Sequence, residues 1–173
     1  MKTVFKIYLF AACMMGFLNL AHGQSYDLSP VAQEKMEALA FLVGDWKGSG
    51  WMITPDQQRH TFEQIEKVEM QLSGTHLMIE GKGISNGKVI HNALAVISPK
   101  EESGQFAFNS FLQSGTSGSF KAELKGEVLY WYPTEQVRYV IQINESGQWH
   151  EIGEYNMGTE WFQFFEMTLD KVD

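Results

Sequence analysis

The sequence of 173 residues has little cysteine and little positive charge. Cys13 is its only cysteine, so no disulfide can form within the chain. Lys and Arg number 13 against 21 Asp and Glu, which gives a net charge of −8 at neutral pH. An acidic chain without a basic stripe repels phosphate groups, and this argues against nucleic acid and anionic membrane surfaces as partners.

The first 23 residues are typical of a secretory signal peptide. Lys2 and Lys6 form a positive start, residues 7–20 are mostly apolar, and residues 21–23 end in small residues as a cleavage site does. We expect cleavage after Gly23 and a secreted or periplasmic location. An alternative is a lipoprotein anchored at Cys13, because Ala-Ala-Cys partly matches a lipidation site.

The mature chain, residues 24–173, is long enough for one domain with one hydrophobic core. Removing Lys2 and Lys6 takes the net charge from −8 to −10. No apolar run after the signal peptide is long enough to cross a bilayer, so we expect no transmembrane segment. The sequence leaves a homodimer open.

Residues 30–43 predict a short N-terminal helix. Ser29 is a suitable cap, Pro30 suits the first helical position, and apolar residues recur at helical spacing up to Val43.

From residue 45 onward the apolar residues alternate with a period of two, which predicts an all-β domain. The expected strands are 45–53, 59–72, 75–84, 88–98, 105–113, 118–125, 127–132, 136–144, 148–156 and 159–170. The connections are short and rich in turn residues, so neighbouring strands must be antiparallel. A meander of this length removes its exposed edges by closing on itself, and we expect a ten-stranded antiparallel up-and-down β-barrel.

The stretch FLVGDWKGSGWM, residues 41–52, marks the entrance to the first strand. Gly44, Trp46, Gly48 and Gly50 are expected to be structural residues of the barrel. A buried Trp46 would fill one end, and the glycines would permit tight curvature or the close approach of another element.

This stretch and the C-terminal segment GEYNMGTEWFQFFEMTLDKV, residues 153–172, carry a family resemblance. The chain resembles the calycin superfamily of lipocalins, fatty-acid-binding proteins and nitrobindin-like barrels, and above all secreted bacterial lipocalin-like domains of unknown function. The resemblance implies a barrel around an apolar cavity that binds a ligand rather than performing chemistry.

Haem is the cofactor that the nitrobindin-like members of this superfamily imply. Their haem-ligating histidine lies near the C-terminus, but residues 161–173 contain no histidine. An alternative function is therefore a haem-binding or enzymatic barrel that uses His150 or His91. Otherwise we expect no cofactor.

Four residues are candidate ligand contacts: His91, Asn109, Tyr139 and Gln163. His91, Asn109 and Gln163 lie among apolar or small neighbours, where isolated polar groups can orient a ligand, although a filled core would also accommodate them with backbone partners. No catalytic or metal site is predicted. Residues 83–87 match the hydrolase pattern G-x-S-x-G, but a strand follows them in place of the required helix.

The sequence thus favours an exported protein that holds a small, largely apolar ligand inside a β-barrel. A filled barrel whose surface aromatic residues bind a protein or a glycan is the other alternative.

Purification of the mature protein from its native host separates these three functions. The ligand-binding function predicts a co-purifying small organic molecule and no Soret band in the absorbance spectrum. A Soret band that disappears on substitution of His150 or His91 would favour haem. A tight interior that holds no ligand, together with a dimeric mass, would favour the interaction module.

Overall fold

The computed structural model describes residues 26–172. The predicted signal peptide, residues 1–23, and Cys13 lie outside this range. Within it, every helix is too short or too polar to cross a membrane.

The helix α2, Pro30–Glu37, begins as the sequence predicts. Ser29 caps it, its Oγ accepting a hydrogen bond from the Ala32 amide at 3.3 Å. Its end differs from the expected Val43. A turn follows, and the 3₁₀ helix η1, Ala40–Leu42, completes the approach to the barrel.

This break in the helix has a packing reason. Leu39 in the turn and Leu42 in η1 are both fully buried against the end of the barrel. Gly44 then starts the first strand with φ +142°, a backbone conformation that L side chains rarely adopt.

Ten strands follow, and every predicted strand is confirmed to within two residues at each end. They are β1 (Gly44–Ile53), β2 (Arg59–Gln71), β3 (His76–Ser85), β4 (Lys88–Pro99), β5 (Gln105–Leu112), β6 (Ser117–Lys125), β7 (Val128–Thr134), β8 (Val137–Ile143), β9 (Trp149–Asn156) and β10 (Trp161–Val172). A 3₁₀ turn η2, Leu72–Gly74, connects β2 to β3.

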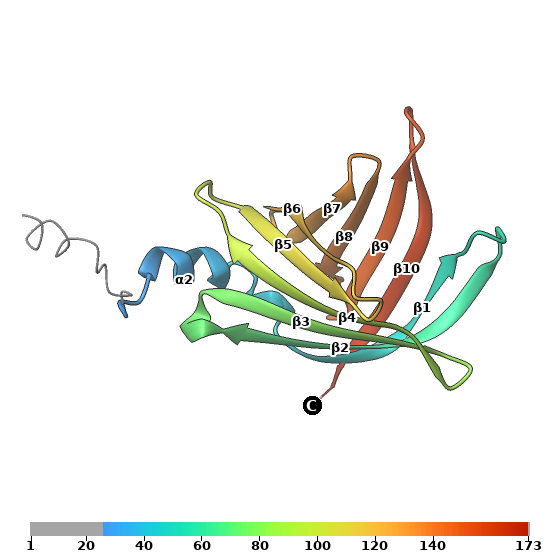
Figure 1. Ribbon diagram of the computed structural model, residues 1–173, viewed down its shortest axis with the longest axis horizontal. Coiled ribbons are helices and arrows are strands. Elements are labelled where there is room, and N and C mark those ends of the chain that lie inside the picture. Colours follow the sequence, from blue (N-terminus) through green and yellow to red (C-terminus); the bar gives the residue numbers. More distant parts are fainter. Residues whose placement is uncertain (1–25, 173) are drawn as a thin grey trace, which may run out of the picture.

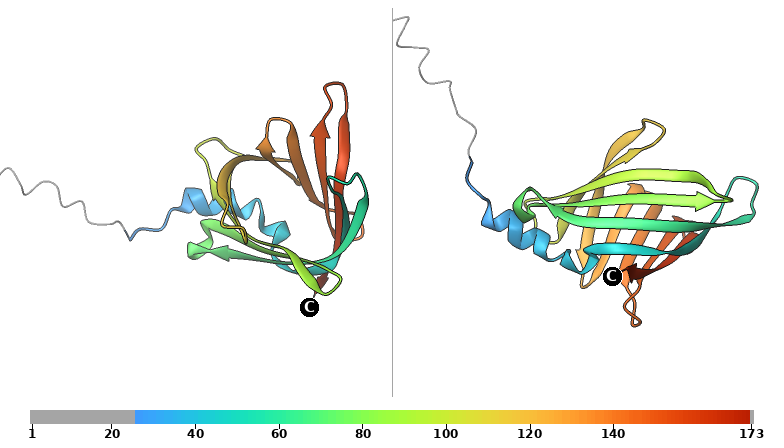
Figure 2. Two further views of the ribbon diagram at one scale, coloured as in Figure 1. Left: turned by 45° about the vertical axis from the view of Figure 1, so that its right-hand side comes forward. Right: turned by 90° about the horizontal axis from the view of Figure 1, so that it is seen from below.

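The strands form a closed barrel in sequence order, with β10 paired to β1. All the pairings are antiparallel, so the predicted up-and-down barrel is confirmed. Figure 2 shows the ring that the strands make and the short helix at one end of it.

The helix covers one end of the barrel. Gln33 donates a hydrogen bond to the Ser73 carbonyl in η2, and Lys35 donates to the carbonyls of Lys100 and Glu101 in the β4–β5 turn. The β1–β2 and β3–β4 turns lie at the opposite end, away from α2 (Figure 1). The two ends of the barrel are therefore different, one covered by the helix and one left open.

Trp46 lies in the covered end. Its side chain is 2% exposed, its indole N–H donates to the Leu42 carbonyl at 2.9 Å, and its ring meets Trp149 edge-on at 5.9 Å. Met36 and Leu39 complete this cluster. The buried N–H is thus satisfied, and the two tryptophans fill the base of the barrel with apolar surface.

Gly48 and Gly50 let β10 approach β1 closely. A Cβ atom at Gly48 would overlap the Thr168 carbonyl oxygen and lie 2.8 Å from the Leu169 Cα. A Cβ atom at Gly50 would meet the ring of Phe62 at 2.6 Å. The seam between the first and last strands therefore has no room for side chains at these positions.

Replacing Gly48 with Ala should destabilise the barrel, since the new methyl group meets backbone atoms that cannot rotate away. We expect the free energy of unfolding, measured by urea denaturation, to fall by about 2 kcal/mol or more. Ser49→Ala is the matched control, because Ser49 is exposed on the same strand and should change stability by less than about 0.5 kcal/mol. Equal effects of the two substitutions would contradict the tight seam.

Candidate ligand cavity

The barrel encloses a cavity of about 380 Å³. This volume lies at the lower end of the range of about 300–1,000 Å³ that is usual for small-molecule sites. Side chains from all ten strands contribute to the wall, and they come from the face that also carries the core. The interior of the barrel is therefore not filled by side chains.

Aromatic rings make up one side of the wall. Trp131 is stacked between Phe108 and Tyr139, with ring centroids 4.4 and 4.7 Å apart and nearly parallel planes. Phe165 continues the wall from Tyr139 and stacks on Phe62 at 5.7 Å. Such packing restrains the rings and presents a large apolar surface to the cavity.

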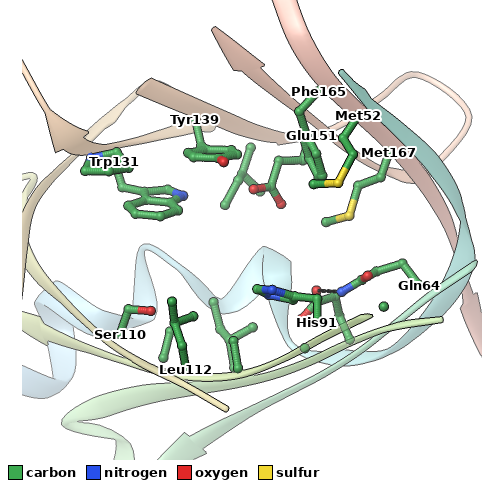
Figure 3. A pocket seen from close by; sticks show the side chains of 18 of the residues that line it. Met52, Gln64, His91, Ser110, Leu112, Trp131, Tyr139, Glu151, Phe165 and Met167 are labelled. Carbon is green, nitrogen blue, oxygen red and sulfur yellow. Dashed lines mark hydrogen bonds between the residues drawn. The ribbon is translucent and has the colours of Figure 1, made fainter. Parts of the chain in front are cut away.

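Smaller and more polar side chains lie across the cavity. Figure 3 shows Trp131, Tyr139 and Glu151 on one side and His91 and Ser110 on the other. The cavity is thus amphipathic, with an aromatic wall facing a mixed one.

Four of the large inward side chains lie directly opposite a glycine of the neighbouring strand. The pairs are Phe62–Gly50, Gln64–Gly83, Glu66–Gly81 and Tyr139–Gly153. A Cβ atom added to any of these glycines would lie within 3.0 Å of its partner's side chain. Each glycine therefore leaves the space that its partner occupies.

Glu66 places a carboxyl group in the wall while only 6% of the residue is exposed. The Gln64 amide donates a hydrogen bond of 2.6 Å to Glu66 Oε1, drawn as a dashed line in Figure 3. Burial, reinforced by the negative charge of Glu151, raises the pKa of Glu66 to about 8, and the hydrogen bond from Gln64 lowers it in part.

Glu151 is the second buried carboxyl group, and it is 8% exposed. The indole N–H of Trp149 donates to Glu151 Oε2 at 3.2 Å. Burial raises the pKa of Glu151 to about 7, while Trp149 and the N–H of Trp131 act in the opposite direction. The Trp131 N–H lies outside hydrogen-bond geometry, so its effect is electrostatic and weaker than that of Trp149.

No lysine or arginine is found among the described residues that line the cavity. Its titratable groups are Glu66, His91, Tyr139 and Glu151. Burial lowers the pKa of His91 and raises that of Tyr139, so both are neutral at pH 7. The two carboxyl groups consequently have no cationic partner among the cavity-lining residues of the described range 26–172.

Several polar groups of the wall lack a partner in the described part of the chain. The Trp131 N–H is buried without an acceptor. The structure shows no hydrogen bond from the Tyr139 hydroxyl, the Ser110 hydroxyl or the His91 ring either. Buried donors are usually satisfied, so the Trp131 N–H marks a position where a ligand could bond. The other three groups line the cavity and are accessible to a ligand from it.

Two of the predicted ligand contacts, His91 and Tyr139, lie in this wall. Tyr139 is half-buried in the aromatic wall, whereas His91 is an exposed residue of the wall.

The other two predicted contacts do not line the cavity. Asn109 is on β5 between Phe108 and Ser110, which face inward, and its amide donates to the Val96 carbonyl at 3.1 Å. Gln163 is displaced by a β-bulge: the pairing shifts between Gln163 and Phe165, which turns Phe165 inward and leaves Gln163 on the outer face. Strict alternation back from Phe165 would place Gln163 inside.

The sequence reasoning missed the two buried acids. Glu151 carried a usable signal, because Trp149 and Gly153 flank it at strand spacing and mark an inward face. Glu66 carried a weaker one: Phe62, Val68 and Met70 share its face at strand spacing, but His60 and Gln64 make that face partly polar. Gly81 and Gly83 lie opposite Glu66 and Gln64, but the sequence does not reveal this pairing unless the strand register is known.

The residues present do not fit haem. His150 is on the outer wall, where its Nε2 lies 3.2 Å from Glu166 Oε1. His91 does line the cavity, but the same lining holds two buried carboxyl groups, and no cation is available for the haem propionates among the described lining residues. In the described part of the chain, no three His, Cys, Asp or Glu side chains are grouped to hold a metal ion.

Comparison with known proteins supports the fold alone. No protein-family model matches the sequence, and no curated protein matches it. Sixteen chains of solved structures match, among them the crystal structure of Rv2717c from M. tuberculosis, with a TM-score of 0.61 and 15% sequence identity. The match covers 85% of this chain and 100% of that chain. The chain is therefore a closed ten-stranded barrel similar to this neighbour.

The buried acids should make the protein less stable as the pH rises. Between the unperturbed pKa of 4.5 and the folded pKa values of about 7 and 8, the folded state keeps protons that the unfolded state releases. The contribution of these two groups to the free energy of unfolding is thus fully present below pH 4.5 and is lost as the pH rises to about 8. The loss is roughly 1.4 kcal/mol for each tenfold difference in proton affinity between the folded and the unfolded states.

Glu66→Gln and Glu151→Gln should remove this loss, because the amide resembles the protonated acid. We expect each variant to exceed the unsubstituted protein in free energy of unfolding at pH 8.5 by more than about 1 kcal/mol, and by less at pH 5. Denaturant titrations at both pH values measure this. Glu63→Gln, exposed on the same strand as Glu66, should show no such pH dependence. A similar response in all three variants would contradict the raised pKa values.

Proposed function

We propose that this protein binds a small, largely apolar molecule inside the barrel. The supporting observation is the cavity of about 380 Å³, walled by stacked aromatic rings and bearing polar groups without partners. A rigid apolar wall with a few directed polar groups is the usual form of a small-molecule site. The absence of an assembled nucleophile and base among the described lining residues favours binding over catalysis.

The open end of the barrel supports passage of an apolar molecule. Ile90 and Leu112 line the cavity and are also more than a third exposed, and Val89 and Phe111 lie exposed beside them. Phe162 adds an exposed ring on β10. An apolar rim of this kind can receive a ligand of the same character from a membrane or from another protein.

We also propose export, on the grounds of residues 1–23. A binding protein outside the cytoplasm would take up its ligand there and carry it through an aqueous compartment.

A cavity-blocking substitution tests this function. Ala93 lines the cavity from β4, and Phe at this position would occupy part of the space. We expect N-phenyl-1-naphthylamine, a neutral apolar dye, to bind the purified protein saturably with a rise in fluorescence. Ala93→Phe should weaken this binding at least tenfold, or about 1.4 kcal/mol.

Asn92→Phe is the matched control, because Asn92 is the exposed neighbour on the other face of β4. It should leave the dye affinity within twofold. The proposed function is wrong if the dye does not bind saturably, or if both variants bind it as the unsubstituted protein does.

A further inference from the structure

The buried acids of the cavity carry information about the ligand's charge. A carboxylate removed from water is costly unless a cation or several hydrogen bonds compensate for the loss. Glu66 and Glu151 are both more than nine-tenths buried, and no lysine or arginine lines the cavity in the described part of the chain. The compensating charge must then come from a proton or from a bound molecule.

The hydrogen bonds around these acids suit their ionised forms. Trp149 can only donate, and it donates to Glu151. Gln64 likewise directs its NH₂ group at Glu66. Each pair leaves the second carboxyl oxygen without a bond in the described structure, so that oxygen is free for a ligand. The site thus supplies donors for a carboxylate but no counter-ion.

The aromatic wall is suited to a cation as well. Trp131 and Tyr139 belong to the wall on the side of Glu151 (Figure 3), and Phe165 packs against Tyr139. The faces of such rings attract an ammonium group, more strongly where water is excluded. An organic cation fits better than a metal ion, because the described residues offer no cluster of metal ligands.

We infer that the ligand is a lipophilic organic cation, an amine or ammonium compound, whose nitrogen is paired with Glu151 and the adjacent Glu66. This inference rests on the proposed function and specifies the ligand class for the same cavity. A fatty acid is disfavoured, because its carboxylate would meet two acids and no basic residue among the described lining residues. The net charge of −8 adds a favourable long-range field for cations.

Three probes with the same tail test this inference: octylamine, octanol and octanoate. Isothermal titration calorimetry on the purified protein at pH 8 compares their affinities. Octylamine stays charged at this pH, as a lysine side chain does. We expect it to bind at least tenfold more tightly than octanol, and octanoate to bind more weakly than octanol. Ala93→Phe should weaken octylamine binding, which separates the cavity from the acidic surface.

Substitution of the acids identifies the counter-ion. Glu151→Gln and Glu66→Gln, made separately, should each reduce octylamine affinity, Glu151→Gln by at least tenfold, and leave octanol affinity within threefold. Glu63→Gln should change neither. Near-UV circular dichroism verifies that each variant retains its packed aromatic wall. In the unsubstituted protein, octylamine affinity should rise from pH 6 to pH 8 as Glu151 and Glu66 ionise. Loss of any proton from His91, whose pKa burial lowers, acts in the same direction, and Tyr139 stays neutral throughout because burial raises its pKa.

The outcomes distinguish the two proposals. Octanol or octanoate binding as tightly as octylamine, or octylamine binding unchanged in both acid variants, overturns the cationic ligand but leaves the binding function intact. Failure of all three probes to bind overturns both.

Discussion

The contact between β1 and β10 is the constraint on which the rest of the molecule depends. It joins the first strand to the last and leaves the barrel without an exposed edge. Gly48 and Gly50 allow it, because the backbone of β10 occupies the space where their side chains would be. Once the ring is closed, every strand has one face in a shared interior, and the content of that interior is set by the pairing register.

The register also explains how the cavity remains open at one end and packed at the other. Trp46, Trp149 and the helix fill the covered end with large apolar side chains. Towards the mouth, β4 contributes Ala93, whose small side chain leaves space, while Glu66 and Gln64 occupy the space at Gly81 and Gly83. The large aromatic residues of β7 and β8 cover only the opposite wall. An uneven distribution of volume around the ring therefore creates the cavity, without a missing strand or a broken turn.

The sequence was sufficient to predict the architecture, because alternation and turn chemistry are local. The turns at Asn86-Gly87 and Gly126, with positive φ, divide strands where the sequence indicates. The contents of the cavity depend on register and on three register shifts between paired strands, which are not local. Gln163 shows this most clearly, since one extra residue in β10 places it on the face opposite to Phe165. The burial of Glu66 depends on the space beside Gly81, and only the strand pairing identifies Gly81 as its neighbour.

The pairing of large side chains with glycines has a consequence for divergence within this fold. A relative that needs a bulkier residue at Gly81 has to shorten Glu66 in the same step or soon after, because the two share one volume. The same holds for Gly153 and Tyr139. Ligand preference in such barrels would then evolve through paired substitutions on adjacent strands, in which one residue becomes larger as its partner becomes smaller. Correlated substitutions at these paired positions would accompany each change of ligand.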